Sequence, residues 1–508
     1  MFSPFSKDLF VFDIANNHQG SVDHGINIIK EFGKLAKEKN VRCIFKFQFR
    51  DLSTLIHPEF INSTENKHIK RFTSTKLRIE DYQILLDEVK NQGLLSMCTP
   101  FDEKSVDRIT EMGFDFIKVA SCCATDWPLL KKISEAFMPT VISTGGLKIK
   151  EIDNLVSFFK HKGNDFALMH CVSVYPSEDN ELSLNQIDLF KKRYSKIPIG
   201  WSTHEHPYNT TAVAIAKSKG ASLFERHVGL NNEEISLNLY SSTPEQAGKW
   251  IDSYISALKM CGDGLKRTHP DNEQHSLEIL KRGVYLKDDI EIGQYLTKDK
   301  VFFAMPLQEN QLDSGAWNDK IKVRKSLKIN DPILKKSIKT LDNNHGNKIL
   351  KEAIHEIKAL LNEASIVLNS EFDIEFSHHY GKEQFFKVGT FIVNCINREY
   401  CKKILVQLPG QKHPVHYHLK KEETFQVLYG CLETITEGQR RTLHPGQTLL
   451  IQPGVWHSFW SNNGCVFEEV STTHFNNDSI YNDKKINDMK REDRKTTATN
   501  WGRFTIND

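Results

Sequence analysis

Two histidines, His204 and His227, come at or just after the ends of successive apolar segments, "IPIGWS" and "ASLFERHV". Glu225 and Arg226 stand directly before His227, and because unpaired charge is costly to bury, these groups either reach water or serve a function. Imidazoles that meet at one place suit a borderline divalent ion with positions open for water and substrate. The alternative, which an isolated pair would favour, is that each histidine hydrogen-bonds a loop carbonyl.

Amine and hydroxyl side chains lie near the ends of further apolar segments. Lysine supplies a point charge and hydroxyl groups supply directional donors, so together they could surround a small anion bearing phosphate and carboxylate. A metal ion beside that anion would polarise a carbonyl oxygen, which indicates carbon–carbon bond formation. These side chains are Lys46, Thr99, Lys118, Ser121, Ser143, Ser173 and Ser202.

A Schiff-base aldolase is the competing mechanism for the same residues, with Lys46 or Lys118 as the nucleophile. The histidine pair argues against it, because aldolases of this type need no ion. A protein that binds carbohydrate at both of its sites without turnover is the alternative from a different functional class.

The segments that carry these residues alternate with amphipathic, helix-like stretches between residues 9 and 228. Eight strand–helix units in roughly 250 residues predict a (β/α)8 barrel, whose chemistry lies at the C-terminal ends of the strands. An open doubly wound sheet is the competitor, but no glycine-rich turn follows the first segment. The eight segments are "LFVFDIA", "CIFKFQF", "LLSMCTPF", "FIKVAS", "TVISTG", "FALMHCV", "IPIGWS" and "ASLFERHV".

Beyond the barrel, which we assign to 1–265, three further parts are expected. Short alternating segments predict a small β-rich domain over 275–335. A stripe of apolar residues at helical spacing predicts a linker helix within 340–370 that packs on a neighbour. From 371 to 508 the pattern becomes all-β, with strands bounded by Gly, Pro and Asn, and it ends in a polar tail that wraps the domain or is partly mobile.

Eight motifs in the barrel region resemble the sialic acid synthase family, which makes N-acetylneuraminate and related nonulosonates. They occur in the family's order and read "IANNHQG", "FKFQ", "CTPFD", "FIKVAS", "ISTGG", "MHCVSVYP", "IGWSTH" and "FERHVGL". The region 275–335 resembles the family's antifreeze-like (SAF) domain. The resemblance therefore implies a homodimer in which this domain reaches over the partner's barrel.

The resemblance also implies a reaction, the condensation of phosphoenolpyruvate with an open-chain aldose such as an N-acylmannosamine, with release of phosphate. His204 and His227 would hold Mn²⁺ or Mg²⁺, while Gln48 and Tyr175 would contact the sugar. Phosphoenolpyruvate would be bound by Lys46, Thr99, Lys118, Ser121, Ser143, Ser173 and Ser202. The transition state carries positive charge near C2, so a nearby carboxylate is needed as well.

The departures from the family pattern fall on the sugar side of the site. Asp13, which we also expect to be catalytic, stands where the family usually has Glu, and Asn231 stands where a sugar-contacting Asp is expected. An Arg-Pro pair of the family appears as Met305-Pro306. These changes predict the same reaction on a different aldose, such as one without the N-acetyl group.

A second constellation, in "GQKHPVHYHLKKEETFQVLYG" and "GQTLLIQPGVWHSFW", resembles the two motifs of cupins. Side chains alternate along a strand, so His416 and His418 share a face, and Glu423 and His457 complete a site for Mn²⁺, Zn²⁺, Fe²⁺ or Ni²⁺. The layout resembles metal-dependent sugar isomerases of the D-lyxose isomerase type, with Glu469 or Lys421 as the group that transfers a proton. A sugar-binding or regulatory cupin is the alternative.

Composition excludes several classes of partner. The 67 basic and 65 acidic residues leave a formal net charge of +2. The chain therefore lacks the strong positive electrostatic field that attracts nucleic acid or a membrane surface. No apolar segment approaches the ~20 residues that span a bilayer, and the first residues lack the pattern of a signal peptide. Ten cysteines without regular spacing indicate reduced thiols in a cytoplasmic protein.

Overall fold

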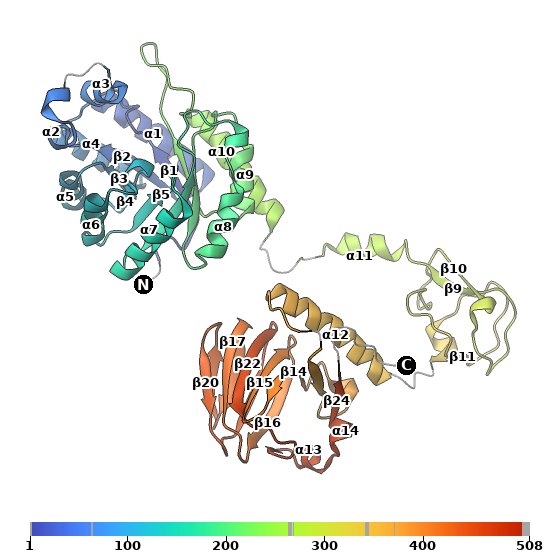
Figure 1. Cartoon of the computed structure of the whole chain (residues 1–508). Coiled ribbons are helices and arrows are strands. Elements are labelled where there is room, and N and C mark those ends of the chain that lie inside the picture. Colours follow the sequence, from blue (N-terminus) through green and yellow to red (C-terminus); the bar gives the residue numbers. More distant parts are fainter. Residues whose placement is uncertain are drawn as a thin grey trace. The chain divides into compact units, whose positions relative to one another are not determined.

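The structure, a computed structural model, describes residues 3–61, 65–262, 267, 269–340, 345–369 and 371–499. The chain divides into two compact units, Met1–Thr268 and His269–Asp508 (Figure 1). All ten cysteines are free. Among the helices of the described ranges, none combines the length and the apolar character that crossing a membrane requires.

The first unit is a closed barrel of eight parallel strands, and each strand pairs with its neighbours in sequence. β1 closes the barrel by pairing with β8, which places Asp13 beside both His227 and Lys46 in the strand register. The predicted (β/α)8 barrel is therefore confirmed. Its strands are β1 (Leu9–Asp13), β2 (Cys43–Phe49), β3 (Leu95–Pro100), β4 (Phe116–Val119), β5 (Thr140–Ser143), β6 (Phe166–Cys171), β7 (Ile199–Thr203) and β8 (Leu223–His227).

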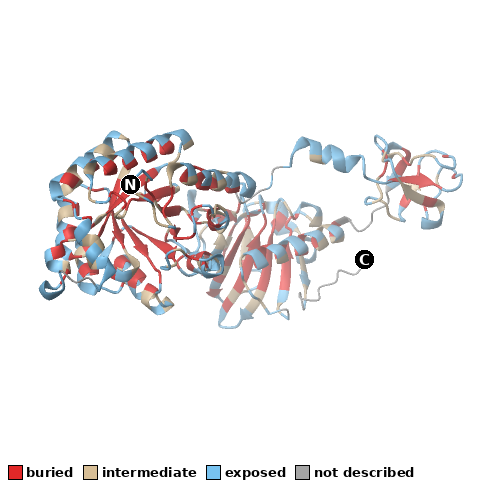
Figure 2. Ribbon diagram, turned by 90° about the horizontal axis from the view of Figure 1, so that it is seen from above, coloured by how far each residue is buried: buried red, intermediate tan, exposed pale blue. Residues whose placement is uncertain are grey.

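Helices surround the barrel, with buried faces toward the strands and exposed faces outward (Figure 2). Capping residues define both ends of the first helix, α1. Ser21 caps its start by accepting a hydrogen bond from the backbone N–H of His24, and Asn40 ends it in the left-handed conformation. The helices are α1 (Val22–Lys39), α4 (Ile79–Asn91), α5 (Glu103–Met112), α6 (Trp127–Glu135), α7 (Ile149–Lys162), α8 (Asn185–Arg193), α9 (Thr211–Ser218) and α10 (Pro244–Cys261).

The N-terminal half of the barrel interior is filled by apolar side chains. Val11, Ile44, Met97 and Leu223 belong to this buried cluster. Gly200 on β7 leaves room for it, since a Cβ there would lie 2.3 Å from the sulfur of Met169. Because the lower interior is packed, polar side chains can gather only at the C-terminal ends of the strands.

An insertion between β2 and α4 stands over the C-terminal ends of the strands. It contains α2 (Leu52–Leu55), a 3₁₀ turn (Pro58–Phe60) and α3 (Lys67–Ser74). No residue of α3 is buried, so this helix adds no side chain to the barrel core. Its position matters instead for the shape of the cavity described below.

Within the second unit, a small β-rich part has its own apolar core, which includes Val284, Val301 and Ile321. Two antiparallel strand pairs, β9 with β10 and β11 with β12, frame that core. The helix α11 (Asp271–Glu278) precedes it and buries no residue. The strands are β9 (Gly283–Leu286), β10 (Val301–Ala304), β11 (Ile321–Val323) and β12 (Ile338–Thr340).

The rest of the second unit consists of two antiparallel sheets and one long helix. The helix α12 (His345–Glu363) contributes buried Leu350 and Ile357 to a cluster with Phe376 and Phe391, so it is part of this core. The larger sheet has the order β20-β17-β22-β15-β14-β13-β24 and the smaller one β19-β18-β21-β16-β23. The last strand, in the polar tail, pairs with β13.

The strands of these two sheets are short and follow one another closely along the chain. Two small helices, α13 (Lys484–Asp488) and α14 (Arg491–Arg494), precede the last strand. The strands are β13 (Asp373–Ser377), β14 (Thr390–Asn397), β15 (Tyr400–Gln407), β16 (Lys412–His418), β17 (Glu423–Gly430), β18 (Leu432–Thr436), β19 (Gln439–Leu443), β20 (Thr448–Ile451), β21 (His457–Trp460), β22 (Cys465–Thr472), β23 (Ser479–Tyr481) and β24 (Lys495–Ala498).

Candidate active site and metal centre

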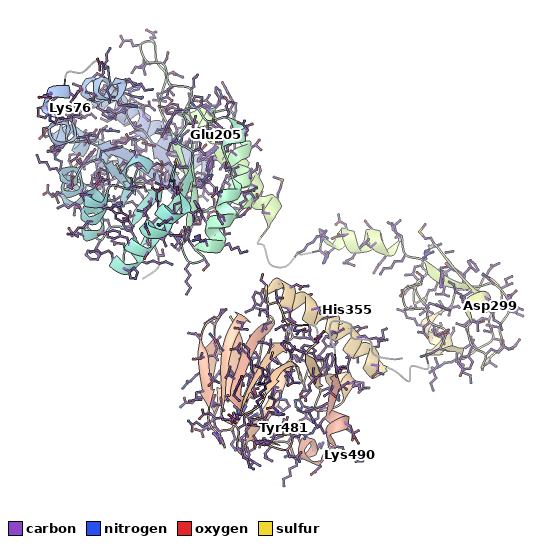
Figure 3. The ribbon with its side chains drawn as sticks, viewed as in Figure 1. Lys76, Glu205, Asp299, His355, Tyr481 and Lys490 are labelled. Atoms are coloured by element: carbon purple, nitrogen blue, oxygen red, sulfur yellow. The ribbon has the colours of Figure 1, made fainter. Side chains whose placement is uncertain are left out.

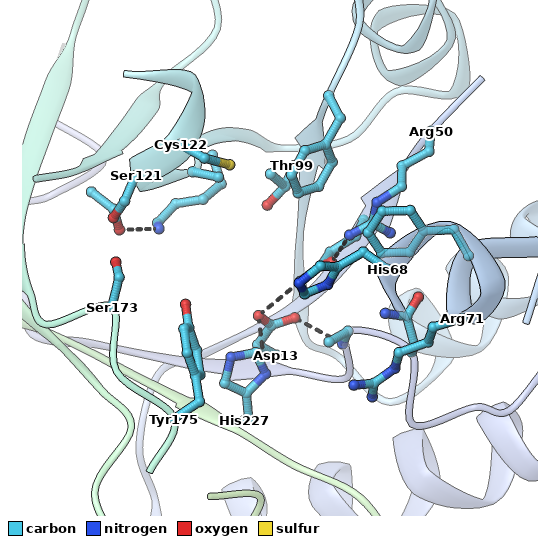
Figure 4. Close-up of a pocket in the computed structure, with 18 of the residues that line it drawn as sticks. Asp13, Arg50, His68, Arg71, Thr99, Ser121, Cys122, Ser173, Tyr175 and His227 are labelled. Carbon is cyan, nitrogen blue, oxygen red and sulfur yellow. Dashed lines mark hydrogen bonds and ion pairs between the residues drawn. The ribbon is translucent and has the colours of Figure 1, made fainter. Parts of the chain in front are cut away.

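A cavity of about 1120 Å³ opens at the C-terminal ends of the barrel strands (Figure 4). Its walls carry all the barrel residues for which the sequence predicts a role in binding or chemistry. These are Asp13, Lys46, Gln48, Thr99, Lys118, Ser121, Ser143, Ser173, Tyr175, Ser202, His204 and His227.

Two lysines and two carboxylates meet at the floor of the cavity. The Lys46 Nζ lies 2.8 Å from Asp13 Oδ2 and 2.8 Å from Glu225 Oε1. The Lys118 Nζ lies 3.5 Å from Glu225 Oε2 and donates a hydrogen bond of 2.5 Å to the Ser143 hydroxyl. Glu225 therefore stands between both amines, although the predicted set of catalytic residues does not include it.

Burial and charge act in opposite directions on these groups. Burial raises the pKa of Glu225, but the charges of Lys118 and Lys46 outweigh it and hold that pKa well below the ordinary value. Burial also raises the pKa of Asp13, but the charges of Lys46 and His227 outweigh this effect and hold that pKa below its ordinary value. Both carboxylates are therefore ionised at neutral pH.

The two lysines differ in how far their charge is compensated. Burial lowers the pKa of Lys46, yet Asp13 and Glu225 together raise it above the ordinary value. For Lys118 burial is the largest effect and Glu225 only partly offsets it, so its pKa is lowered. An anion that binds in the cavity would therefore stabilise the cationic form of Lys118 more than that of Lys46.

Hydroxyl groups converge on one side of the cavity, where Figure 4 shows Ser121 and Ser173 near each other. The backbone N–H of Gly145 donates to the Ser121 hydroxyl at 3.1 Å. The Thr99 hydroxyl is buried and has no hydrogen-bond partner within the described part of the chain. This side of the cavity thus offers several directional donors to an anion.

Replacing Gly145 by Ala should raise the KM for an anionic substrate by about 10- to 100-fold, because small displacements in a reacting site are costly. A Cβ at this position would lie 2.4 Å from the Ser173 hydroxyl and 2.7 Å from the Ser121 hydroxyl, so both would be displaced. Steady-state kinetics with phosphoenolpyruvate measures the effect. Gly248→Ala, on α10, is the control. An unchanged KM in Gly145→Ala would show that the Ser121 and Ser173 hydroxyls do not bind the anionic substrate.

The two predicted histidine ligands lie side by side. The ring centroids of His204 and His227 are 5.3 Å apart, with 33° between the ring planes. The Nδ1 of His204 bonds the Val172 carbonyl oxygen at 2.7 Å, as outer partners do in metal sites, and the Cys171 thiol also interacts with the His204 ring. The Nδ1 of His227 lies 3.4 Å from Asp13 Oδ2. The Tyr175 ring contacts His204, with ring centroids 4.2 Å apart and 47° between the ring planes.

Strand alternation sorts the polar residues at the strand ends into two groups. Glu225 and His227 line the cavity, whereas Arg226 faces the helices, 5.4 Å above the Trp250 ring and 3.7 Å from Glu205. Glu205 is labelled in Figure 3. Polar residues near the strand ends therefore do not all converge on the cavity, and His170 on β6 is a second exception. Its ring bonds the Leu182 carbonyl outside the barrel.

Four basic residues that the sequence reasoning missed also line the cavity. Arg50 follows Lys46 and Gln48 at two-residue spacing, and this strand alternation was a signal that could have identified it. Lys67, His68 and Arg71 come from α3, and no local pattern relates that helix to the barrel mouth. Figure 4 shows Arg50, His68 and Arg71 on the side of the cavity away from Ser121 and Ser173.

The second unit contains the predicted cupin cluster. One ligand atom from each of four buried residues, His416, His418, Glu423 and His457, lies within 4.8 Å of the others. Among the described residues, such a group of three or more potential ligands occurs only here. The Glu423 Oε1 and the His457 Nε2 are 2.8 Å apart and neither has a hydrogen-bond partner in the described structure.

The other ring nitrogens of the cluster are held by neighbouring groups. The Nδ1 atoms of His416 and His457 each bond a backbone carbonyl at 3.0 Å, and the Nδ1 of His418 bonds the Ser479 hydroxyl at 3.2 Å. This arrangement fixes the rings and directs each Nε2 inward, as outer partners do in metal sites. The unpaired atoms and the donor set fit a divalent ion.

A network of buried charges adjoins the cluster. Lys421 lies 2.5 Å from Glu423 Oε2 and 2.9 Å from Glu469 Oε1, and Lys403 reaches the same Glu469 oxygen at 3.3 Å. The cavity lined by these groups has a volume of about 40 Å³. It is much smaller than the cavity of the barrel.

Comparison with known families assigns both regions. The model of the NeuB family matches residues 34–266, and a cupin-domain model matches residues 404–467. A crystal structure from Chromobacterium violaceum, assigned as spore coat polysaccharide biosynthesis protein E, has 39% sequence identity and a TM-score of 0.62. The match covers 66% of this chain and all of that one.

Three relatives each match part of the chain. An uncharacterized protein of Methanocaldococcus jannaschii is 30% identical over 57% of this chain and 82% of its own. The N-acetylneuraminate-9-phosphate synthase of Drosophila melanogaster is 29% identical over 49% of this chain and 68% of its own. The N,N'-diacetyllegionaminic acid synthase of Campylobacter jejuni is 25% identical over 59% of this chain and 91% of its own.

Proposed function

The chain belongs to the NeuB family, and from this premise we propose that its barrel condenses phosphoenolpyruvate with an open-chain aldose. The products are a 3-deoxy-2-keto sugar acid and inorganic phosphate. The observation that carries the proposal is the meeting of Lys46, Lys118, Asp13 and Glu225 below converging hydroxyls in one cavity. The names of the Drosophila and Campylobacter relatives support the same class of reaction.

The cationic and hydroxyl side of the cavity suits phosphoenolpyruvate. Lys118 and Lys46 would meet its phosphate and carboxylate charges, and Thr99, Ser121, Ser143, Ser173 and Ser202 would donate hydrogen bonds to the oxygens. Gln48 and Tyr175 would then contact the aldose. Each of these residues lines the cavity.

The reaction forms one carbon–carbon bond and, at C2, replaces the carbon–oxygen bond to phosphate by a bond to the oxygen of water. C3 of phosphoenolpyruvate attacks the aldehyde carbon, and the aldehyde oxygen takes up a proton. Water adds to the cationic C2 and gives up a proton, and the tetrahedral intermediate then expels phosphate together with the bridging oxygen. Asp13 and Glu225, ionised beneath the site, stabilise the positive charge at C2 in the transition state.

The two barrel histidines fit a divalent ion, for which Mn²⁺ or Mg²⁺ is expected. Their centroid separation of 5.3 Å lies within the 4.1 to 5.7 Å range of the three histidine pairs in the cupin cluster. When bound by His204 and His227, the ion would polarise the aldehyde carbonyl. Tyr175 holds the His204 ring from the side.

Phosphate release from phosphoenolpyruvate over a panel of aldoses tests the proposal. We expect release only when a suitable aldose is present, and its loss in His204→Ala or after chelation. A Schiff-base aldolase would instead form an adduct with pyruvate that borohydride traps, and a carbohydrate-binding scaffold would release no phosphate. Full activity of His204→Ala with a chelator present would refute the barrel mechanism.

For the cupin we propose a bound divalent ion, either Mn²⁺, Zn²⁺, Fe²⁺ or Ni²⁺, held by His416, His418, Glu423 and His457. Interconversion of aldose and ketose, which would supply the barrel, stays a prediction. The position of Lys421 between Glu423 and Glu469 supports it, because these groups can exchange a proton. Sugar binding without turnover is the competing role.

The homodimer with an exchanged SAF-like domain over 275–335 also stays a prediction. Apolar side chains exposed on that part of the chain, such as Ile292, Met305 and Ile329, are consistent with a surface that a partner covers. Sedimentation of the full chain decides the question, since a monomer at micromolar concentration would exclude the exchange.

A further inference from the structure

The cavity of the barrel has an outer wall that the reaction proposed above does not use. The insertion between β2 and α4 supplies this wall, and we call its basic residues Arg50, Lys67, His68 and Arg71 the outer basic wall. Figure 4 shows three of them across the cavity from Ser121 and Ser173. Ligand pockets usually enclose about 300–1,000 Å³, so a cavity of about 1120 Å³ has room beyond a three-carbon acid.

The lining of the cavity has an excess of positive charge. Five lysine and arginine side chains line it against two carboxylates, Asp13 and Glu225. The five are Lys46, Arg50, Lys67, Arg71 and Lys118. Both carboxylates lie at the floor and are paired with Lys46 and Lys118. No carboxylate in the described part of the lining therefore neutralises the outer basic wall.

Arg50 is held in a fixed orientation. Its guanidinium lies between two aromatic rings, 4.0 Å from the centroid of Phe72 and 4.1 Å from that of Phe101. One of its terminal nitrogens donates to the side-chain oxygen of Gln48. The rings cover both faces of the guanidinium, so only its edge can donate further hydrogen bonds.

One nitrogen of that edge lacks a partner. The Nε of Arg50 is buried and makes no hydrogen bond within the described structure. An arginine whose side chain is already fixed and whose N–H group is unsatisfied loses little entropy when it binds an oxyanion. Arg50 is therefore built to receive a ligand and is not an ordinary solvated surface charge.

Arg71 brings a second unneutralised charge to the same place. Its side chain has no carboxylate partner among the described residues, whereas Arg78, further along the insertion, is paired with Asp81 at 2.8 Å. Burial lowers the pKa of His18 to about 4, and the charges of Arg50 and Arg71 both contribute to that lowering. The positive charges of Arg50, which follows β2, and of Arg71, on α3, thus both act near His18.

We propose that the outer basic wall is a second anion subsite, which binds a phosphate carried by the acceptor aldose at the end away from its aldehyde. This inference rests on the proposed function and specifies its substrate class, an aldose phosphate. Gln48 joins the two ends of the site, because its side chain donates to Asp13 at 3.3 Å and accepts from Arg50. An aldose chain lying along Gln48 would place its aldehyde near His227 and its phosphate at Arg50.

Matched pairs of acceptors test the subsite. The pairs are mannose with mannose 6-phosphate, N-acetylmannosamine with its 6-phosphate, and arabinose with arabinose 5-phosphate, each with saturating phosphoenolpyruvate and inorganic phosphate as readout. For the accepted sugar, kcat/KM should be at least about 100-fold higher with the phosphate than without it, since hydrogen bonds between charged groups are strong. A ratio near one would overturn the subsite while leaving the condensation itself intact.

Variants assign the effect to the wall. Arg71→Ala should lower kcat/KM for the phosphorylated acceptor by about 10-fold or more and leave that for the free sugar nearly unchanged. Arg50→Ala also removes the hydrogen bond to Gln48, so it should lower both values, but that for the phosphorylated acceptor by about 10-fold more. Lys70→Ala, which removes an exposed charge from α3 outside the cavity lining, is the control and should alter neither. Equal losses on both forms of the sugar would contradict a phosphate contact.

A binding measurement separates failure of the subsite from failure of the proposed function. Mannose 6-phosphate is titrated calorimetrically into the full chain saturated with phosphoenolpyruvate, with mannose as the reference. If no aldose supports phosphate release, the proposed function fails, and the subsite then stands only if mannose 6-phosphate binds the wild type more tightly than Arg50→Ala. Equal binding to both proteins overturns the subsite.

Discussion

The Glu225→Gln protein is expected to release phosphate from phosphoenolpyruvate and an aldose about 1,000-fold more slowly than the wild type. Two effects add. The amide has no charge to stabilise the cation that develops at C2, and it leaves Lys46 and Lys118 without the carboxylate that stands between them. Removing one partner of a buried ion pair costs about 3–5 kcal/mol, so the melting temperature should also fall.

Initial rates and thermal melting, measured on the same preparations, distinguish loss of catalysis from loss of folding. Glu245→Gln is the control, because it removes a carboxylate from the exposed start of α10 and should change neither quantity appreciably. A folded Glu225→Gln protein with at least a tenth of the wild-type rate would show that this carboxylate is not needed at C2.

The Glu423→Gln protein is expected to lose the cupin ion. An amide supplies a weaker ligand than the ionised carboxylate, whose pKa burial raises but which Lys421 and His418 hold well below its ordinary value. Elemental analysis should show one divalent ion fewer per chain than in the wild type. Added metal should raise the melting temperature of the wild type and have little effect on the variant, since a ligand stabilises only a state that binds it.

Glu433→Gln is the matched control for this experiment, because Glu433 is also a buried glutamate of the same unit and is paired with Arg440, outside the cluster. Its metal content should equal that of the wild type. Glu423→Gln protein that retained its full complement of ions would contradict the assignment of Glu423 as a ligand. Phosphate release by the barrel reports separately on the other site.

The same two proteins bear on the isomerase hypothesis. An aldose–ketose isomerase that transfers a proton, as proposed for Lys421 and Glu469, can exchange the hydrogen at C2 of an aldose with solvent. Ketose should therefore form, and deuterium from D₂O should enter the sugar, with the wild type and not with Glu423→Gln. The cavity of about 40 Å³ beside the cluster must open for a sugar to reach the ion. Absence of both ketose formation and exchange with every aldose and ketose in the panel would leave binding as the role of this domain.

Much of the barrel could be predicted from the sequence because its strands are buried along their whole length and its helices are amphipathic. The two periodicities differ, and their alternation defines the fold. Strand alternation also predicts which polar groups share the cavity: Glu225 and His227 are two residues apart and face inward, while Arg226 faces the helices. Applied to β6, the same rule would have placed His170 outside.

Other parts of the site depend on contacts that no local pattern records. Arg71 reaches the cavity only because an insertion after β2 stands over the barrel mouth. The charge network of Lys421 and Glu469 joins residues 48 positions apart, one in the segment between β16 and β17 and the other on β22. The helix α12 has the apolar stripe of a linker packing on a neighbour, but only the folded structure shows that the neighbour is the sheet containing Phe376 and Phe391.

Isotope transfer from phosphoenolpyruvate labelled with ¹⁸O at the oxygen bridging C2 and phosphorus tests most directly whether this barrel condenses phosphoenolpyruvate with an aldose. If the barrel catalyses this condensation, the label leaves with inorganic phosphate and the product has the mass of the aldose plus pyruvic acid. Label retained in the carbon product, or phosphate released without any such product, would contradict it.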